Sequence, residues 1–294
     1  MNLIKLKSRA KINLSIDVLG KREDGYHFVE MIMQTIDLYD TLTINILDED
    51  VIKINTNSLD IPIDEENIVY KATKLIKASF GIKNGVEIYI DKKIPVAGGM
   101  AGGSSNAAAT LVGLNKIFDL KLDDEKLKEI GLKLGADVPF CIVGGTFLAQ
   151  NIGEKLTKIE PLTDKVHILV CKPELFVSTK EVYEGLDLSN LENRPDNKYL
   201  IRCLENNDIS SLSSNMKNVL ESVTSKKYSE IDDIKNIMKK NDCLGCMMSG
   251  SGPTVFGIFD CEKLAKNAKE ELLKKYNQVF LINSSDKGVD ILNG

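Results

Sequence analysis

Residues 95 to 109 read Pro-Val-Ala-Gly-Gly-Met-Ala-Gly-Gly-Ser-Ser-Asn-Ala-Ala-Ala, and the prediction of the fold starts from this glycine-rich stretch. Upstream of it, Val86, Ile88 and Ile90 alternate with polar residues, which predicts a half-buried strand. Downstream, the alanine-rich run from Ala107 to Leu114 predicts a packed helix. A strand therefore leads into a glycine loop that opens a helix.

This loop has the chemistry of an anion site. Glycine tolerates positive φ and has no Cβ, so several backbone N–H groups can turn toward one guest. The first N–H groups of the helix are unpaired and lie at the positive end of its dipole, so we expect the guest to be a phosphate. Ser104 or Ser105 is expected to cap the helix, leaving the other hydroxyl for the phosphate or its metal. The alternative is a flexible turn followed by an ordinary cap.

The spacing excludes the two commonest phosphate loops. A Walker loop ends in Gly-Lys-Ser/Thr, and no lysine precedes Ser104. A dinucleotide fingerprint requires Gly-x-Gly-x-x-Gly, but Met100 stands two residues after Gly98.

Composition bounds the class of protein. With 294 residues the chain is long enough for two domains, and 43% hydrophobic with 28% charged residues is ordinary for a soluble protein. A formal net charge of -5 argues against a nucleic-acid binder. Charged residues from Lys5 to Lys11 interrupt the N-terminus, and no stretch is apolar enough to span a membrane. We expect a cytoplasmic protein, monomeric or weakly dimeric, that binds neither nucleic acid nor membrane.

Cysteines and histidines give little support for a metal centre. Cys243 and Cys246 form one Cys-x-x-Cys without a second pair, inside an apolar run that predicts a strand. The chain has only two histidines, His27 and His167, so a histidine-rich site is excluded.

The first half of the chain is predicted to be mixed α/β with antiparallel strands. Aliphatic runs between aspartate-rich turns indicate the strands, and a one-sided apolar pattern that stops at Gly81 indicates a helix. Asp137 is placed to cap a short helix with Pro139 in its first turn. The predicted strands are 5–17 with an irregular middle, 28–36, 41–47, 51–55 and 144–150, with a loop at 20–26 and helices at 67–80 and 123–134.

The second half has the order βαββαβ, the split arrangement of a ferredoxin-like domain. Its predicted strands are 166–171, 244–248, 254–259 and 279–282, with helices within 178–240 and at 262–275. The polar stretch from Asn151 to Lys165 is the predicted boundary. We therefore expect an α+β chain with an N-terminal domain over 1–157 and a C-terminal domain over 158–294.

Three further stretches carry polar residues that packing does not obviously require. Residues 9–15 alternate, so Lys11 and Asn13 point to one side of a strand, which is either solvent or a site. Asp137 is either a simple cap or a functional carboxylate. Residues 249–254, Ser-Gly-Ser-Gly-Pro-Thr, are either a hairpin connection or part of a site.

Taken together, these motifs resemble the GHMP small-molecule kinases over nearly the whole chain. The matching segments are Ala10-Lys-Ile-Asn-Leu14, Gly25-Tyr-His27, the glycine loop, Gly135-Ala-Asp-Val-Pro139 and Ser249-Gly-Ser-Gly-Pro253. The resemblance implies a two-domain GHMP-kinase-like fold. One motif narrows the resemblance to a branch of this family, the one whose acceptor is a cytidine diphosphate-linked methylerythritol of non-mevalonate isoprenoid biosynthesis. That branch usually has Arg-Asp-Gly-Tyr-His, and this chain has the similar Arg22-Glu-Asp-Gly-Tyr-His27, which departs from it by one residue.

The resemblance implies transfer of the ATP γ-phosphoryl group to the tertiary 2-hydroxyl of that acceptor, with Mg²⁺ accompanying the nucleotide. Asp137 matches the carboxylate that orients the hydroxyl and accepts its proton. Lys11 matches the cation that holds Asp137 ionised and stabilises charge on the phosphoryl group. Whether Asp137 is a base or chiefly a positioning group is left open.

The resemblance also assigns binding residues. Ala101 stands where glycine is frequent, and because alanine resists positive φ we expect a small local adjustment there. An atypical segment, Lys172 to Thr179, precedes Tyr183, so Phe176 is a rival to Tyr183 as the second ring on cytosine. The implied acceptor residues are Asn13, Tyr26, His27, Thr179 and Tyr183, and the implied ATP residues are Pro95, Val96, Ala97, Gly98, Gly99, Met100, Ala101, Gly102, Gly103, Ser104, Ser105, Asn67 and Lys92.

Two other functions fit parts of the pattern. A GHMP kinase for mevalonate, homoserine or a sugar shares the glycine loop, but such acceptors have no pyrimidine for Tyr26 to stack on. A non-catalytic nucleotide-sensing or RNA-binding module shares the fold class. The acidic balance and the pairing of Lys11 with Asp137 argue against that module.

Overall fold

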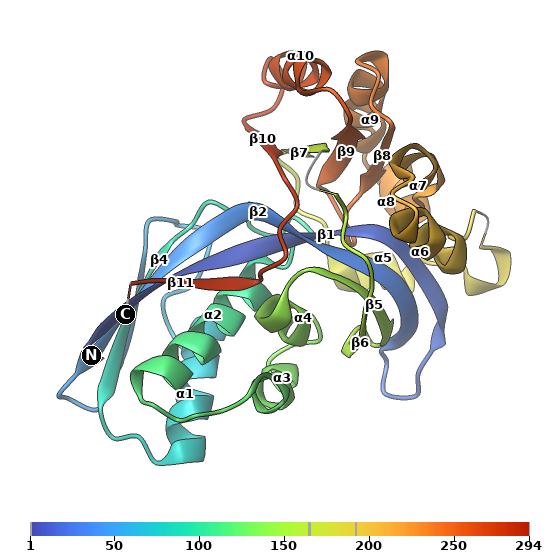
Figure 1. Ribbon diagram of the computed structural model, residues 1–294. Helices are drawn as coiled ribbons and strands as arrows, with labels where there is room; N and C mark the ends of the chain where they lie inside the picture. The colour runs from blue at the N-terminus through green and yellow to red at the C-terminus, as the bar shows by residue number, and fades with distance from the viewer. Residues whose placement is uncertain (1, 164–165, 192, 294) are drawn as a thin grey trace.

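Two long antiparallel strands form the spine of the molecule. The computed structural model describes residues 2–163, 166–191 and 193–293. In it, β1 (Leu3–Lys21) pairs with β2 (His27–Leu47), and the two strands run across both halves of the molecule (Figure 1). The irregularity predicted in the middle of the first strand is present as β-bulges within one continuous strand, whereas the prediction of two strands at 28–36 and 41–47 was wrong, because β2 is continuous over that range. The register shifts between Arg9 and Lys11 and again between Asn13 and Ser15. Bulges bend a strand and re-aim its side chains, and these two flank Lys11 and Asn13.

The first sheet has the order β11-β1-β2-β4-β3, and β5 pairs with both β2 and β6. Two of its strands, β6 and β11, were not predicted. The segment that forms β6 reads Lys-Leu-Thr-Lys and lies in the stretch expected to be a boundary, of which Asp164 and Lys165 lie outside the described residues. Strand β11 lies near the C-terminus and pairs with the N-terminal part of β1, so both ends of the chain lie at one end of this sheet (Figure 1). The remaining bounds are β3 (Ile52–Thr56), β4 (Gly85–Asp91), β5 (Thr146–Asn151), β6 (Lys155–Lys158) and β11 (Val289–Asn293).

Four helices cover one face of the first sheet (Figure 1). The first of them begins after Asn67, whose side chain caps it by accepting a hydrogen bond from the Val69 N–H. It ends at Gly81 with φ 65°, which is the stop that the sequence predicts. The bounds of the four are α1 (Ile68–Phe80), α2 (Gly102–Ile117), α3 (Asp124–Leu132) and α4 (Val138–Val143).

The second sheet confirms the ferredoxin-like prediction. Its order is β10-β7-β9-β8 with every pair antiparallel, as the βαββαβ topology requires. Its strands are β7 (His167–Lys172), β8 (Gly245–Met248), β9 (Val255–Phe259) and β10 (Gln278–Ile282). Its helices are α5 (Thr179–Glu184), α6 (Asn197–Glu205), α7 (Ile209–Asn215), α8 (Glu221–Lys227), α9 (Glu230–Lys240) and α10 (Glu262–Leu272), with a 3-10 turn η1 (Leu188–Asn190).

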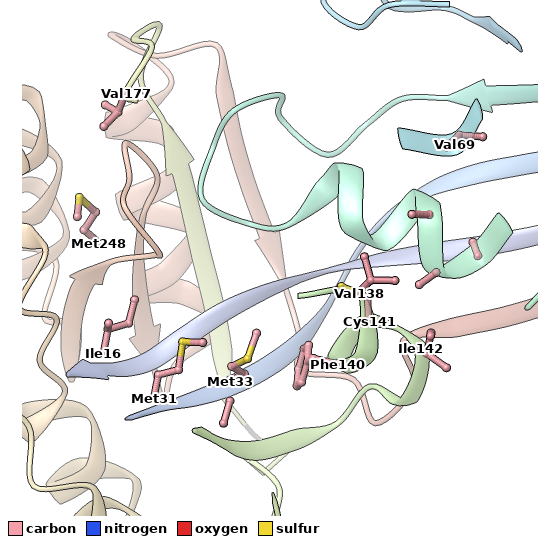
Figure 2. Close-up of a cluster of buried hydrophobic side chains, with 14 of the residues drawn as sticks. Ile16, Met31, Met33, Val69, Val138, Phe140, Cys141, Ile142, Val177 and Met248 are labelled. Atoms are coloured by element: carbon pink, nitrogen blue, oxygen red, sulfur yellow. The ribbon is translucent and has the colours of Figure 1, made fainter. Parts of the chain in front are cut away.

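The spine strands are buried on both faces. Met31 and Met33 of β2 lie close to Phe140 of α4 in one core cluster (Figure 2). On the opposite face, Ile12 and Leu14 of β1 belong to a second cluster with apolar residues of the second sheet. Each half of the molecule therefore packs on the same two strands, and this arrangement places any side chain that projects from the middle of β1 at the junction of the two halves.

Candidate active site

A cleft of about 1130 Å³ lies at this junction, lined by residues from both halves of the chain. Deep clefts of this size are the usual place for small-molecule sites. All the predicted site residues except Met100 and Ser105 are among the residues that line it. Those two are buried beneath the loop, Met100 in the second core cluster and Ser105 against β1.

The glycine loop follows β4 and opens α2, as the sequence predicts. Three residues in it have positive φ: Ala97 at 51°, Gly99 at 72° and Ala101 at 55°. The expected local adjustment at Ala101 is not observed, because this alanine itself adopts the left-handed conformation. Glycine is required at position 99, where a Cβ would lie 2.3 Å from the Ser249 carbonyl oxygen.

The capping prediction for the serines was wrong. Ala101 is the N-cap of α2 and provides no side-chain hydrogen bond, while both serines lie within the helix. The Ser105 hydroxyl is turned inward, where it donates to the Arg9 carbonyl oxygen at 2.6 Å. Ser104 lines the cleft together with Gly102 and Gly103. The N-terminus of α2 therefore has no side-chain cap and borders the cleft, which suits an incoming anion.

The side chains of Lys11 and Asp137 meet beside the loop. The Lys11 ammonium lies 3.7 Å from Oδ2 of Asp137 and donates to Oδ1 of Asn13 at 2.7 Å. Lys11 is only 5% exposed and Asn13 is fully buried, so they are not on a solvent-facing strand side. The Lys11 backbone N–H also donates to the Met100 carbonyl oxygen at 3.1 Å, which ties this part of β1 to the glycine loop.

Asp137 occupies the N-cap position of α4, but its side chain makes no capping hydrogen bond. Its backbone lies in the helical region rather than the extended one that a capping side chain needs. The carboxylate is therefore available to Lys11 and to a ligand in the cleft, and the reading of Asp137 as a simple cap does not hold.

A buried aspartate that sequence reasoning missed contacts residues on both sides of the glycine loop. Asp40 in β2 is fully buried and forms an ion pair with Lys92. It also accepts hydrogen bonds from the Asn106 amide at 2.8 Å and from the backbone N–H groups of Lys93 at 2.7 Å and Ile94 at 2.8 Å. A buried charge requires such full pairing. The local sequence offered no signal for this pairing, because Asp40 stands beside Asp37 in a stretch that reads as a polar turn.

Lys92 and Asn67 line the cleft on the side of α1 and α2. The Lys92 ammonium lies 3.1 Å from where a Cβ on Gly102 would stand, so this cation is beside the start of α2. The Asn67 side chain is committed to structure, because it caps α1 and donates to the Pro62 carbonyl oxygen at 2.6 Å.

Aromatic rings also line the cleft. The rings of His27 and Tyr183 have centroids 5.0 Å apart and are tilted by 36°. Burial raises the pKa of Tyr183 to about 12, and the negative charge of Asp137 adds to this. Burial, and then the charge of Lys21, lower the pKa of His27. Tyr26 is 59% exposed at the rim, whereas Phe176 is 74% exposed and is not among the residues that line the cleft.

The turn between β8 and β9 is more than a hairpin connection. Ser249 donates through its hydroxyl to the Gly99 carbonyl oxygen at 3.1 Å, and a Cβ on Gly250 would lie 2.8 Å from the same oxygen. Ser251 lines the cleft and its hydroxyl lies 2.8 Å from that of Thr179. The second half of the chain thus contacts the glycine loop through backbone that only glycine permits.

Two classes of feature are absent from the described residues. Within 2–163, 166–191 and 193–293, no three histidine, cysteine, aspartate or glutamate side chains gather as metal ligands. In the same part of the chain, no helix combines the length and apolar character that a membrane crossing requires.

Comparison with known proteins identifies the family. The family models for the GHMP kinases N terminal domain and the GHMP kinases C terminal match residues 67–145 and 200–278. The chain is 66% identical over 291 residues to the 4-diphosphocytidyl-2-C-methyl-D-erythritol kinase of Clostridioides difficile, covering 99% of this chain and 98% of that one.

Solved structures agree with this result. A crystal structure of 4-(cytidine 5'-diphospho)-2C-methyl-D-erythritol kinase matches with a TM-score of 0.80 at 27% identity, over 96% of this chain and 99% of that one. Homoserine kinase from Cytophaga hutchinsonii matches with a TM-score of 0.81 at 20% identity, over 99% and 98% of the two chains, and shows the shared fold.

Proposed function

The chain belongs to the GHMP kinases and, within them, to the 4-diphosphocytidyl-2-C-methyl-D-erythritol kinases, and we propose that it phosphorylates the 2-hydroxyl of that cytidyl methylerythritol with ATP. The observation that carries the proposal is one cleft that combines two kinds of chemistry. The Lys11–Asp137 pair stands beside the glycine loop, and the rings of His27 and Tyr183 line the same cleft.

Phosphoryl transfer depends mainly on positioning and on neutralising charge. In our proposal the N–H groups of the loop and of the first turn of α2 hold the phosphates. The acceptor hydroxyl donates to Asp137, its oxygen bonds to Pγ as the bridging bond to ADP breaks, and its proton passes to Asp137. Lys11 is positioned by Asn13 and stabilises the charge on the transferring group. In this scheme Asp137 acts as both a positioning group and the proton acceptor.

The acceptor's cytosine is proposed to stack on the aromatic rings that line the cleft. Tyr183 and Tyr26 offer ring faces, and His27, kept neutral by its lowered pKa, offers one N–H donor and one lone pair to the base edge. Thr179 and Asn13 also line the cleft, and we propose that they bind the part of the acceptor between the base and the reacting hydroxyl. A mevalonate or homoserine molecule would leave the rings uncovered.

We propose that Mg²⁺ enters with the nucleotide. The described residues contain no preformed cluster of metal ligands, which fits an ion held mostly by phosphate oxygens and water. The oxygen-bearing side chain that would complete its coordination is Ser104, which lines the cleft. Bound there, Mg²⁺ would neutralise phosphate charge. Chelation should abolish turnover, and added Mg²⁺ should restore it.

The remaining expectations are proposals of the same kind. We propose a functional division near residues 157 and 158. The loop, Lys11 and Asp137 lie on the N-terminal side, and residues of the C-terminal side such as Thr179, Tyr183 and Ser251 complete the cleft. Strand β11 is an exception, since it pairs with β1. We also propose a cytoplasmic enzyme that is a monomer or weak dimer, which sedimentation at several concentrations would test.

A substrate panel tests the function directly. ADP release is measured with the cytidyl methylerythritol, mevalonate and homoserine as separate acceptors. We expect turnover with the cytidyl compound alone. Turnover with mevalonate alone would assign a different GHMP activity, and ATP binding without ADP release from any acceptor would favour the non-catalytic module.

A further inference from the structure

The Thr254 hydroxyl is buried beneath the glycine loop and finds no hydrogen-bond partner among the residues that the structure describes. Thr254 immediately precedes β9 and is fully buried. In the described part of the chain its Oγ1 has no hydrogen-bond partner. A buried hydroxyl without a partner costs free energy, and native proteins keep few of them, so each one calls for an explanation.

Its position points to the loop. A Cβ built on Gly98 would lie 2.9 Å from Thr254 Oγ1 and 3.4 Å from the Pro95 carbonyl oxygen. The Met100 methyl group lies at 3.3 Å from the same point, so the hydroxyl and the loop backbone are neighbours beside the Met100 side chain. A few residues away, the Ser249 hydroxyl already donates to the carbonyl oxygen of Gly99. The turn before β9 thus presents two hydroxyls to the loop, one of them paired and one not.

The geometry of a peptide unit suggests when the second bond forms. In a trans peptide the N–H and the C=O point in opposite directions. A loop peptide that turns its N–H into the cleft toward a phosphate turns its carbonyl oxygen away from the cleft, toward the buried turn. That oxygen then needs a donor, and Thr254 can supply one.

We propose that Thr254 is a positioning residue for the nucleotide, whose hydroxyl donates to a carbonyl oxygen of residues 95–98 when ATP is bound. The proposal rests on the assignment of residues 95–105 as the ATP loop. In the free enzyme the buried hydroxyl lowers the stability of the fold. In the complex it stabilises the loop conformation in which the N–H groups of the loop point toward the phosphates.

Thr254→Val and Thr254→Ser separate this role from packing. Valine keeps the shape and removes the hydroxyl, whereas serine keeps the hydroxyl and removes a methyl group. Binding of the β,γ-imido analogue of ATP is measured by calorimetry, and the thermal midpoint of the free enzyme is measured alongside. We expect Thr254→Val to unfold at or above the wild-type temperature yet bind the analogue about fivefold more weakly. Thr254→Ser should unfold at a lower temperature and bind nearly as tightly as wild type.

The opposite patterns overturn the proposal. Equal affinity in wild type and Thr254→Val would show that the hydroxyl has no role in nucleotide binding. Affinity that falls in step with the thermal midpoint in both variants would show a purely structural role. Failure of the wild-type enzyme to bind the analogue would instead contradict the proposed function, so the two failures are distinguishable. A kinetic check is the KM for ATP, which should rise in Thr254→Val while the KM for the acceptor stays unchanged.

Discussion

Lys11 and Asp137 stand 3.7 Å apart in the cleft although one projects from β1 and the other from the start of α4. Packing sets this distance. The bulges in β1 aim Lys11, and Val138 and Phe140 anchor α4 in the core below the spine strands (Figure 2). Because apolar packing holds α4, its first residue does not need a capping bond, and the Asp137 carboxylate remains free for chemistry.

The first prediction concerns this carboxylate. Asp137→Asn keeps the shape but cannot accept the proton of the acceptor hydroxyl, so kcat should fall by about 100-fold or more. Affinity for ATP should change little, because the phosphates are proposed to bind the loop. Steady-state kinetics and calorimetry measure the two effects. Asp119→Asn is the matched control, since its side chain is 81% exposed on a distant turn. Unchanged turnover in Asp137→Asn would remove this residue from the mechanism.

The second prediction identifies the cytosine stack. Loss of one base-stacking ring should weaken acceptor binding by about 1–3 kcal/mol, so Tyr26→Ala and Tyr183→Ala should each raise the KM for the cytidyl substrate. Phe176→Ala is the control, because that ring projects into solvent away from the cleft. The KM for ATP should stay constant in all three. A larger effect of Phe176→Ala than of Tyr183→Ala would reverse the assignment.

The sequence was sufficient for elements whose signals are local. The helix from Asn67 to Gly81 carries its own cap and stop, and the four strands of the second sheet are continuous apolar runs. Strand β11 has no comparable signal, since its pairing with β1 joins the two ends of the chain. Strand β6 is short and carries charged residues. Such strands form because a neighbouring strand pairs with them, so the hydrophobic pattern of their own residues does not reveal them.

The third prediction follows from the lowered pKa of His27. Its pKa in the folded protein lies below the ordinary value of 6.5, so as pH falls below 6.5 the unfolded chain is protonated first. The free energy of unfolding should therefore decrease as pH falls from about 6.5 to the folded pKa of His27. Urea unfolding at pH about 7.5 and about 5.5 measures the loss.

His27→Gln should reduce that loss of stability, because glutamine does not titrate. His167→Gln is the control: it removes the other histidine, which lies in β7 and is not among the residues lining the cleft. An identical pH dependence in wild type and His27→Gln would contradict the prediction.

The roles and contacts of the site residues were harder to predict from the sequence than their identities. Motifs named the residues, but the serines were misread as caps because a cap signal does not distinguish the first residue of a helix from one in its first turn. Asp40 was missed because its partners, Lys92 and Asn106, are distant in sequence. Buried ion pairs depend on tertiary contacts, which no local pattern encodes.

The last prediction tests the strain in the loop. Ala101 has φ 55°, a left-handed conformation that costs a residue with a Cβ about 1–2 kcal/mol. Glycine removes this cost but gives the unfolded chain more conformational freedom, which cancels part of the stabilisation. Ala101→Gly should therefore raise the free energy of unfolding by about 0.5–1 kcal/mol, and leave ATP affinity unchanged because the N–H group at this position is kept.

The opposite substitution, glycine to alanine, is tested at position 99, two residues earlier. Gly99→Ala would place a Cβ 2.3 Å from the Ser249 carbonyl oxygen, so it should lower both stability and ATP affinity. Urea unfolding and nucleotide titration of the two variants measure these effects, and destabilisation by Ala101→Gly would show that packing of the methyl group outweighs the backbone strain.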